Sequence, residues 1–187
     1  MLMAQTPRAW TLAELDRLPD DGNRYEVIDG ELFVTPAPSP AHEALASVLH
    51  AIIEPYARAQ QIGRVYYRPR AVVRVLRSEV ERDLMVRPIT ATPPLTWAEA
   101  PTPSLVVEIL SATTRRRDHV QKREFYLRIG VAEYWIVDRW DRTIRVITPA
   151  TDDVVLDSAL VWRPTGTTDG LVIDVAEYFR EALGVLA

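Results

Sequence analysis

Two acidic side chains lie where the sequence makes a charge costly. Glu108 is in the middle of 105–110, a nearly all-apolar run that is typical of a strand buried on both faces. Asp83 is in a second strand candidate, 80–86. A buried carboxylate without a partner must be protonated, paired or bound to a cation. Both residues are therefore candidates for chemistry.

If the two strands are neighbours, Asp83 and Glu108 converge. Two like charges about 4 Å apart repel by ~4 kcal/mol at an effective dielectric constant of about 20. A divalent cation converts that repulsion into coordination, and ligands that are all oxygen atoms suit Mg²⁺ or Mn²⁺. We therefore predict that these two carboxylates form a metal site.

The only lysine among 22 basic residues, Lys122, could serve the same site. A helix is expected over 115–129, and on it Lys122 shares a stripe with Phe125, which should face the sheet. Lys122 is about 10 Å along this helix, and Glu108 is about 7–10 Å back from the end of its strand, so the two lie at about the same level. The first interpretation is an ammonium beside the carboxylates. The alternative is a surface ion pair with Asp118, four residues earlier.

A mixed sheet with flanking helices is expected to hold these residues. A short helix follows the capping box that begins at Thr11, and a hairpin over 25–34 turns at Asp29-Gly30, which favours a type I′ turn. Strands are expected at 65–67, 71–76, 80–86, 105–110, 134–137, 142–147, 154–162 and 171–173, helices at about 40–60, 115–129 and 174–183, and a proline-rich loop at 88–103. The strand, helix and strand between 105 and 137 predict a right-handed parallel βαβ unit. The fold class is α/β or α+β with a mixed sheet.

Composition excludes several classes of protein. The length fits one domain, 1–187, and 48% apolar with 26% charged residues is ordinary for a globular protein. Cysteine is absent, which excludes disulfides, thiolate nucleophiles and cysteine-bound metals. The P-loop, G-x-G-x-x-G, G-x-S-x-G and H-E-x-x-H motifs are absent, and the three histidines have no metal-site spacing. Without a signal peptide or a run of about 20 apolar residues, a soluble, cytoplasmic protein is expected.

The charge is unevenly distributed along the chain. Residues 58–128 contain 14 basic and 7 acidic side chains, whereas both flanking segments are acidic and the net charge is −4. The basic middle segment could meet a polyanion, or it could form solvated arginine faces.

Five segments carry a resemblance to a known family. They are Arg24-Tyr-Glu-Val-Ile-Asp-Gly-Glu-Leu, Pro38-Ser-Pro-Ala-His42, Leu105-Val-Val-Glu-Ile-Leu-Ser, Arg117-Asp-His-Val-Gln-Lys122 with Tyr126, and Gly130-Val-Ala-Glu-Tyr-Trp-Ile-Val-Asp138. In this order, over about residues 11–147, the chain resembles the Uma2 family of the PD-(D/E)XK, or restriction-endonuclease-like, nuclease superfamily. The resemblance implies a restriction-endonuclease-like core, a mixed sheet of the αβββαβ type with flanking helices and here an N-terminal β-hairpin.

The resemblance also implies site residues. Asp83 and Glu108 would be metal ligands, and Lys122 would be the catalytic lysine. The superfamily's usual lysine, two positions after the glutamate, is replaced by Leu110, and Uma2-like sequences place it on the following helix. Arg82 stands where the superfamily has the proline of Pro-Asp, and it could partly neutralise Asp83 or point to the opposite face.

The implied activity is that of a Mg²⁺-dependent endodeoxyribonuclease, with Mn²⁺ as a substitute, that hydrolyses phosphodiester bonds in DNA. Two alternatives stay open. One is a catalytically silent nucleic-acid-binding or assembly protein of the same fold, and the other is a metal-dependent hydrolase of small phosphate esters. Homodimers are common in the superfamily, but no segment here specifies an interface.

Further residues are candidates for supporting roles. His42 could look into the site, with a structural histidine as the alternative, and Glu26 could be an auxiliary acid or the partner of an arginine. The DNA backbone would be held by arginines within 58–87 and by three consecutive arginines of the helix, Arg115, Arg116 and Arg117.

Overall fold

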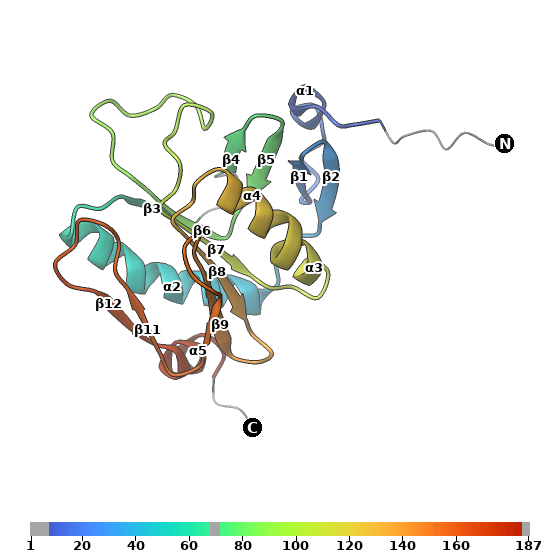
Figure 1. Cartoon of the computed structure of the whole chain (residues 1–187). Helices are drawn as coiled ribbons and strands as arrows, with labels where there is room; N and C mark the ends of the chain where they lie inside the picture. Colours follow the sequence, from blue (N-terminus) through green and yellow to red (C-terminus); the bar gives the residue numbers. More distant parts are fainter. Residues whose placement is uncertain (1–7, 68–71, 185–187) are drawn as a thin grey trace.

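The computed structural model describes residues 8–67 and 72–184, with a six-stranded mixed sheet at the centre (Figure 1). Its strands lie in the order β10-β9-β8-β7-β6-β3. Their bounds are β3 (Arg64–Tyr66), β6 (Leu84–Arg87), β7 (Leu105–Ile109), β8 (Glu133–Asp138), β9 (Thr143–Ile147) and β10 (Val154–Leu156). β7 and β8 pair in parallel, and the other pairs in this sheet are antiparallel.

A helical crossover joins β7 to β8 and covers one face of the central sheet. It consists of α3 (Arg115–Arg117), the π-helical stretch η1 (Asp118–Lys122) and α4 (Arg123–Arg128). Phe125 and Tyr126 of α4 are fully buried against this face. The chain then turns at Gly130, whose φ of +84° favours glycine after a helix. A π-helical turn widens the helix and is frequent at functional sites.

The opposite face is covered by two helices and a hairpin. These are α2 (Pro40–Ala59), α5 (Val175–Leu183), β11 (Ala159–Trp162) and β12 (Leu171–Asp174). Leu45, Leu49 and Ile53 of α2 pack in one core with the sheet and α5, and all three are fully buried. Ser39 caps α2 by accepting a hydrogen bond from the backbone N–H of His42, which fixes where this helix begins.

A second, four-stranded sheet lies along the crossover helix (Figure 1). Its order is β2-β1-β5-β4, with β1 (Arg24–Ile28), β2 (Glu31–Thr35), β4 (Val72–Val75) and β5 (Ser78–Glu81), preceded by α1 (Leu12–Leu15). The turn between β1 and β2 has φ values of 51° at Asp29 and 90° at Gly30, as the predicted type I′ turn requires.

The predicted fold class is confirmed, and two predicted strands are wrong. The stretch 80–86 is divided between β5 and β6, which belong to different sheets, with Arg82 and Asp83 as the link. The stretch 154–162 is likewise divided into β10 and β11, because the chain leaves the central sheet at Asp157 and Ser158. Part of the predicted strand 71–76, Ala71, lies outside the described residues. In the described ranges, none of the helices combines the length and hydropathy that a membrane span needs.

Candidate active site

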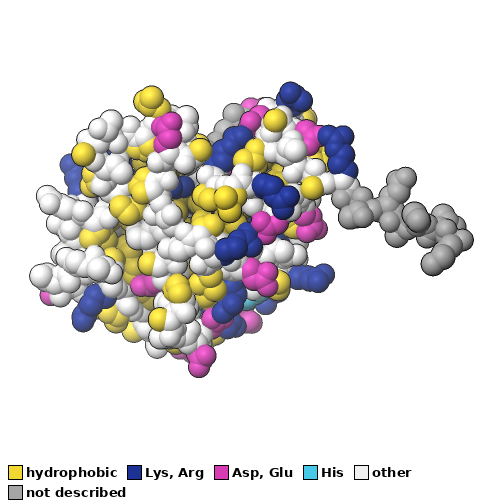
Figure 2. Space-filling view, turned by 45° about the horizontal axis from the view of Figure 1, so that its top comes forward, with side chains coloured by type: hydrophobic (Ala, Val, Ile, Leu, Met, Phe, Trp, Pro, Cys, Tyr) yellow, Lys and Arg dark blue, Asp and Glu magenta, His cyan; other side chains and the backbone are white. Residues whose placement is uncertain are grey.

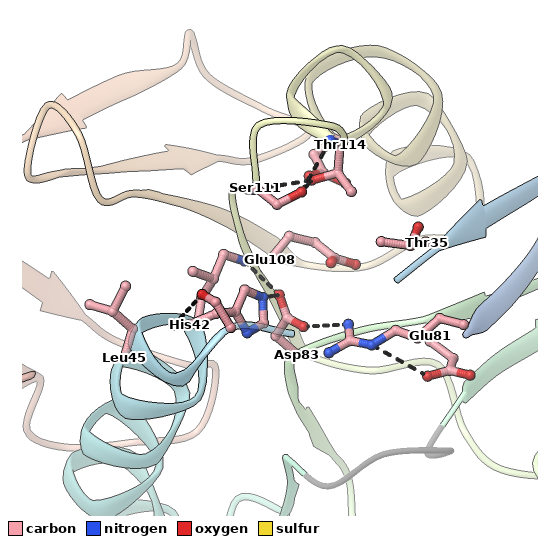
Figure 3. A network of polar contacts seen from close by, with 12 residues as sticks. Thr35, His42, Leu45, Glu81, Asp83, Glu108, Ser111 and Thr114 are labelled. Carbon is pink, nitrogen blue, oxygen red and sulfur yellow. Dashed lines mark hydrogen bonds and ion pairs between the residues drawn. The ribbon is translucent and has the colours of Figure 1, made fainter. Parts of the chain in front are cut away.

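The pairing of β6 with β7 brings Asp83 and Glu108 together. Leu84 lies opposite Val107 and Met85 opposite Val106, so the same register, continued by one residue, places Asp83 opposite Glu108. The backbone N–H of Ile109 donates a hydrogen bond of 2.7 Å to Asp83 Oδ2 across this junction. Figure 3 shows both carboxylates between the start of α2 and the start of the crossover helix. The structure therefore brings the two predicted ligands together.

Asp83 is held by two basic side chains. Arg24 on β1 donates from Nη1 to Asp83 Oδ1 at 2.8 Å, and His42 Nε2 lies 3.0 Å from Asp83 Oδ2 (Figure 3). Burial alone would raise the pKa of Asp83, but the hydrogen bond and charge of His42, with the charge of Arg24, hold this pKa well below its usual range. Asp83 is therefore ionised and fixed in orientation.

Glu108 is 3% exposed and accepts two hydrogen bonds at one oxygen. Lys122 Nζ donates to Oε1 at 2.9 Å, and the Tyr126 hydroxyl donates to the same oxygen at 2.8 Å. Burial raises the pKa of Glu108 to about 8; Lys122 opposes this shift, and the neighbouring Asp83 carboxylate adds to it. Negative charge at Glu108 is thus only partly compensated by its protein partners.

The predicted inward direction of Lys122 agrees with its surroundings. Its ammonium lies 2.9 Å from Glu108 Oε1 and 2.9 Å from Glu26 Oε1, and it donates to the backbone oxygen of Glu81 at 3.0 Å. Asp118 is its neighbour at 3.8 Å, but the alternative of a surface pair is wrong because Lys122 is 2% and Asp118 1% exposed. Burial alone would lower the pKa of Lys122, but the surrounding carboxylates outweigh it and raise this pKa. Lys122 therefore remains an ammonium.

The supporting candidates divide between the site and the surface. Glu26 forms an ion pair of 3.1 Å with Arg117, whose guanidinium also donates to Thr35 and is buried. Arg117 thus lies inside the network and not on a solvated surface. Together with Lys122 it compensates the buried charge of Glu26. Arg115 is bound to Asp138 at 2.7 Å and lines a separate hollow with His119, and Arg116 is exposed.

These side chains surround a cleft of about 190 Å³. Its lining contains Asp83, Glu108 and Lys122, and also His42 and Glu26. The segment 35–39 and the start of the crossover helix form its rims. These five predicted residues therefore line one cleft, whereas Arg115 and Arg116 do not line it.

Arg82 lies next to Asp83 in the chain but does not line this cleft. It lines a neighbouring hollow with Glu43 and Tyr67, and Asp83 borders this hollow as well. Burial lowers the pKa of Arg82 to about 10. Arg82 thus remains electrostatically close to Asp83, whose charge opposes the effect of burial on the Arg82 pKa.

Comparison with known proteins shows the family to which the chain belongs. The Uma2 family, described as "Putative restriction endonuclease", matches residues 12–176. The chain belongs to the Uma2 family. This membership supports a nuclease activity. None of the curated proteins matches the chain.

A solved structure has the same fold as this Uma2 chain. It is a crystal structure of "a putative nuclease belonging to DUF820 from Anabaena variabilis ATCC 29413". The TM-score is 0.78 at 23% sequence identity, and the match covers 92% of this chain and 99% of that chain. The restriction-endonuclease-like fold that the resemblance implies is thereby confirmed.

The Uma2 site offers a metal ion few protein ligands. In the part of the chain that the structure describes, no group of three or more His, Asp or Glu side chains is arranged to hold a metal ion. Mg²⁺, however, is commonly bound by one or two carboxylates, with water and substrate phosphate as the other ligands. The partly compensated charge at Glu108, beside the ionised Asp83, suits such a cation. These two carboxylates are the residues that could hold it.

Two residues of the site had no assigned role in the sequence. Tyr126 lay in the quoted motif, one residue after Phe125, and its hydroxyl is directed at Glu108. Arg24 also lay in a quoted motif, but its ion pair with Asp83 joins β1 to a residue 59 positions later. Periodicity could have indicated that Tyr126 is buried, whereas the Arg24 contact depends on how the two sheets meet.

Proposed function

We propose that this Uma2 protein is an endonuclease that hydrolyses phosphodiester bonds in DNA and uses Mg²⁺, with Mn²⁺ as a substitute. One observation carries the proposal: the buried ammonium of Lys122, 2.9 Å from Glu108, in the cleft that Asp83 also lines. Two acidic groups and one amine in a single cleft are suited to phosphoryl transfer, in which catalysis is mostly positioning and charge stabilisation.

Asp83 and Glu108 would hold the divalent cation, which when bound supplies a Lewis acid for the phosphoryl oxygen. Arg24 and His42 keep the Asp83 carboxylate ionised and fixed. The Tyr126 hydroxyl holds Glu108 by donating to Oε1, the oxygen that Lys122 also contacts. The protein thus orients both carboxylates before any substrate arrives, which lowers the cost of reorganisation during the reaction.

Lys122 is suited to stabilise negative charge and not to accept a proton. Its raised pKa keeps it protonated, so it has no lone pair with which to act as a general base. As a compact ammonium it can donate hydrogen bonds in several directions, including one toward a phosphoryl oxygen or an attacking water. Hydrolysis then proceeds when water attacks phosphorus and the bond to one ester oxygen breaks.

A plasmid assay tests this proposal. Supercoiled plasmid is incubated with purified protein and Mg²⁺ or Mn²⁺, and nicked and linear products are measured over time. We expect metal-dependent nicking by the wild type and a loss of at least about 100-fold in Asp83→Asn and in Glu108→Gln, which remove the negative charges but keep the shapes. Glu79→Gln is the matched control, because Glu79 on β5 pairs with Arg74 and does not line the cleft.

The outcomes separate the alternatives. Nicking that persists in Asp83→Asn and Glu108→Gln at the wild-type rate would contradict the assigned site. DNA binding without nicking under any metal would indicate a catalytically silent protein. Hydrolysis of a small phosphodiester without nicking would indicate a hydrolase of small esters. Circular dichroism melts of each variant show whether a loss of activity reflects unfolding.

A further inference from the structure

The turn after β8 carries an arginine and a tryptophan that the proposed chemistry does not use. We propose that Arg139 binds a backbone phosphate of the DNA strand beside the scissile bond, and that Trp140 is a positioning residue that holds the Arg139 guanidinium. This inference rests on the proposed function, because it assigns a contact of the same site with the same substrate.

The topology places Arg139 at the correct edge of the sheet. β7 and β8 are parallel, with Glu108 opposite Ile136, so both strands end at the same edge. Glu108 lies one residue before the end of β7, and Arg139 follows β8 directly. Arg139 accordingly lines the cleft together with Glu108. A cation in this place can reach a phosphate that lies next to the one held at the carboxylates.

The environment of Arg139 differs from that of the other arginines near the cleft. Arg24 is bound to Asp83, Arg117 to Glu26 and Arg115 to Asp138. By contrast, within residues 8–67 and 72–184, no carboxylate forms an ion pair with Arg139. Its charge is therefore available to an anionic ligand, and phosphate is the anion that the proposed reaction brings into this cleft.

An aromatic ring holds the Arg139 guanidinium. The guanidinium carbon of Arg139 lies 4.4 Å from the centre of the Trp140 ring, well within the range of a cation–π contact. Trp140 is 47% exposed, so its ring lies at the surface, where a DNA strand could approach the guanidinium beside it. The ring restricts where the guanidinium can move, so less conformational freedom is lost when a phosphate binds.

The turn itself is rigid, and this makes the contact well defined. Asp138 Oδ1 accepts a hydrogen bond of 3.0 Å from the backbone N–H of Trp140, and the other carboxylate oxygen of Asp138 pairs with Arg115 at 2.7 Å. The Arg115 guanidinium also lies 5.4 Å from the Trp140 ring centre. The first helical turn after β7 and the turn after β8 are thus tied together at the rim of the cleft.

A binding experiment without cleavage tests the inference. Fluorescence anisotropy measures the affinity of a labelled DNA duplex between 50 and 200 mM salt, with chelator present so that no metal supports hydrolysis. For Arg139→Ala we expect roughly a five- to tenfold weaker affinity and a salt slope reduced by about one, as the loss of one phosphate contact predicts. Arg163→Ala is the matched control, because Arg163 is exposed, follows Trp162 in the chain and does not line the cleft.

Trp140 is tested through its effect on Arg139. Trp140→Leu should raise KM for plasmid severalfold with little change in kcat, and Trp140→Phe should keep most of the affinity. The double variant, Arg139→Ala combined with Trp140→Leu, should bind DNA no more weakly than Arg139→Ala alone. Equal affinity and salt slope for Arg139→Ala, Arg163→Ala and the wild type would overturn the inference. Failure of the wild type to bind or cut any DNA would instead overturn the proposed function.

Discussion

Lys122 is surrounded by carboxylates of three different elements, Glu26 on β1, Glu108 on β7 and Asp118 in η1. It is 2% exposed, so its charge is compensated by protein groups and hardly by water. Breaking a buried ion pair by removing one partner typically costs 3–5 kcal/mol, because the other charge is left unpaired. This one amine therefore contributes to the stability of the site as well as to the proposed chemistry.

Lys122→Arg keeps the charge and changes its shape. A planar guanidinium cannot reproduce the short contacts of the ammonium with Glu26, Glu108 and the Glu81 carbonyl. We expect plasmid nicking to fall by roughly 100-fold and stability to fall by about 1–3 kcal/mol from overpacking. Nicking rates and denaturant melts measure both effects.

The reverse substitution on the same helix is the control for Lys122→Arg. Arg123→Lys should keep nicking near the wild-type rate, because Arg123 is bound to Asp153 away from the cleft. Wild-type nicking by a folded Lys122→Arg variant would show that any buried cation suffices at this position.

Glu133→Gln should change how stability depends on pH. Burial raises the pKa of Glu133, so between the unfolded and folded pKa values the native state binds more protons and stability falls as pH rises. Glutamine keeps the acceptor for the Trp135 indole N–H at 3.0 Å but cannot ionise. The variant should therefore have the same Tm as the wild type below about pH 4 and a higher Tm at pH 7.

Thermal melts from pH 3.5 to 8 measure this difference. The exposed Glu181 provides a control, since Glu181→Gln shows the general effect of removing one negative charge. A Tm difference for Glu133→Gln that is the same at every pH would contradict the assigned cause.

The sequence predicted Asp83, Glu108 and Lys122 as one group, because Glu108 and Lys122 are charged residues in apolar patterns and the family resemblance implies a role for all three. It offered an arginine as one possible partner of Glu26 but did not reveal that this arginine is Arg117, since their pairing joins β1 to α3 across about 90 positions of sequence. Contacts of this kind depend on how elements meet and leave no local pattern.

Among the elements, the link between β5 and β6 explains most of the site. The run from 80 to 86 contains no glycine or proline that would mark a break, although its charged residues, 81–83, and its apolar residues, 84–86, form two blocks and do not alternate. The break allows β5 to pair with β1 and β4 while β6 pairs with β7. As a result Asp83 lies at the junction of two sheets, where Arg24 of one sheet and Ile109 of the other both reach it.

The N-terminus of α2 provides a prediction at this scale. Ser39→Ala removes the hydrogen bond from the backbone N–H of His42 and should cost about 1 kcal/mol. It should also slow nicking, because the first turn of α2 places His42 against Asp83. Denaturant melts and nicking rates are compared for the same preparations.

A second capped helix is the matched control. Asp174 caps α5 by accepting from the backbone N–H of Glu177 at 2.9 Å, so Asp174→Ala should lose a similar free energy of unfolding without slowing nicking. Ser39→Thr should restore both properties of α2. Equal effects of the two alanine variants on nicking would mean that the cap acts on stability alone.

At the scale of the whole molecule, basic and acidic side chains are interspersed. On the face in Figure 2, arginines and acidic residues alternate, so the charged side chains form no single basic patch there. Many arginines of the basic segment pair with carboxylates from the acidic flanks, such as Arg74 with Asp16.

Binding of Mg²⁺ should stabilise the whole fold, since the ion would relieve charge repulsion that only the native state contains. At about 100 times its Kd, such an ion contributes ~2.7 kcal/mol, or roughly 5–10 °C in Tm for a domain of this size. We expect this shift in the wild type and in Glu79→Gln, and its loss in Asp83→Asn combined with Glu108→Gln. A shift of the same size in that double variant would place the ion elsewhere.

The burial of the only lysine side chain has a consequence for chemical labelling. Reagents that acylate amines will find no reactive side chain on the surface of the folded protein, since Lys122 is enclosed and held as an ammonium. Acylation at this position therefore reports each transient opening of the cleft. Lys122 is thus a natural reporter of local opening motions, and peptide mapping can detect its acylation without any introduced probe.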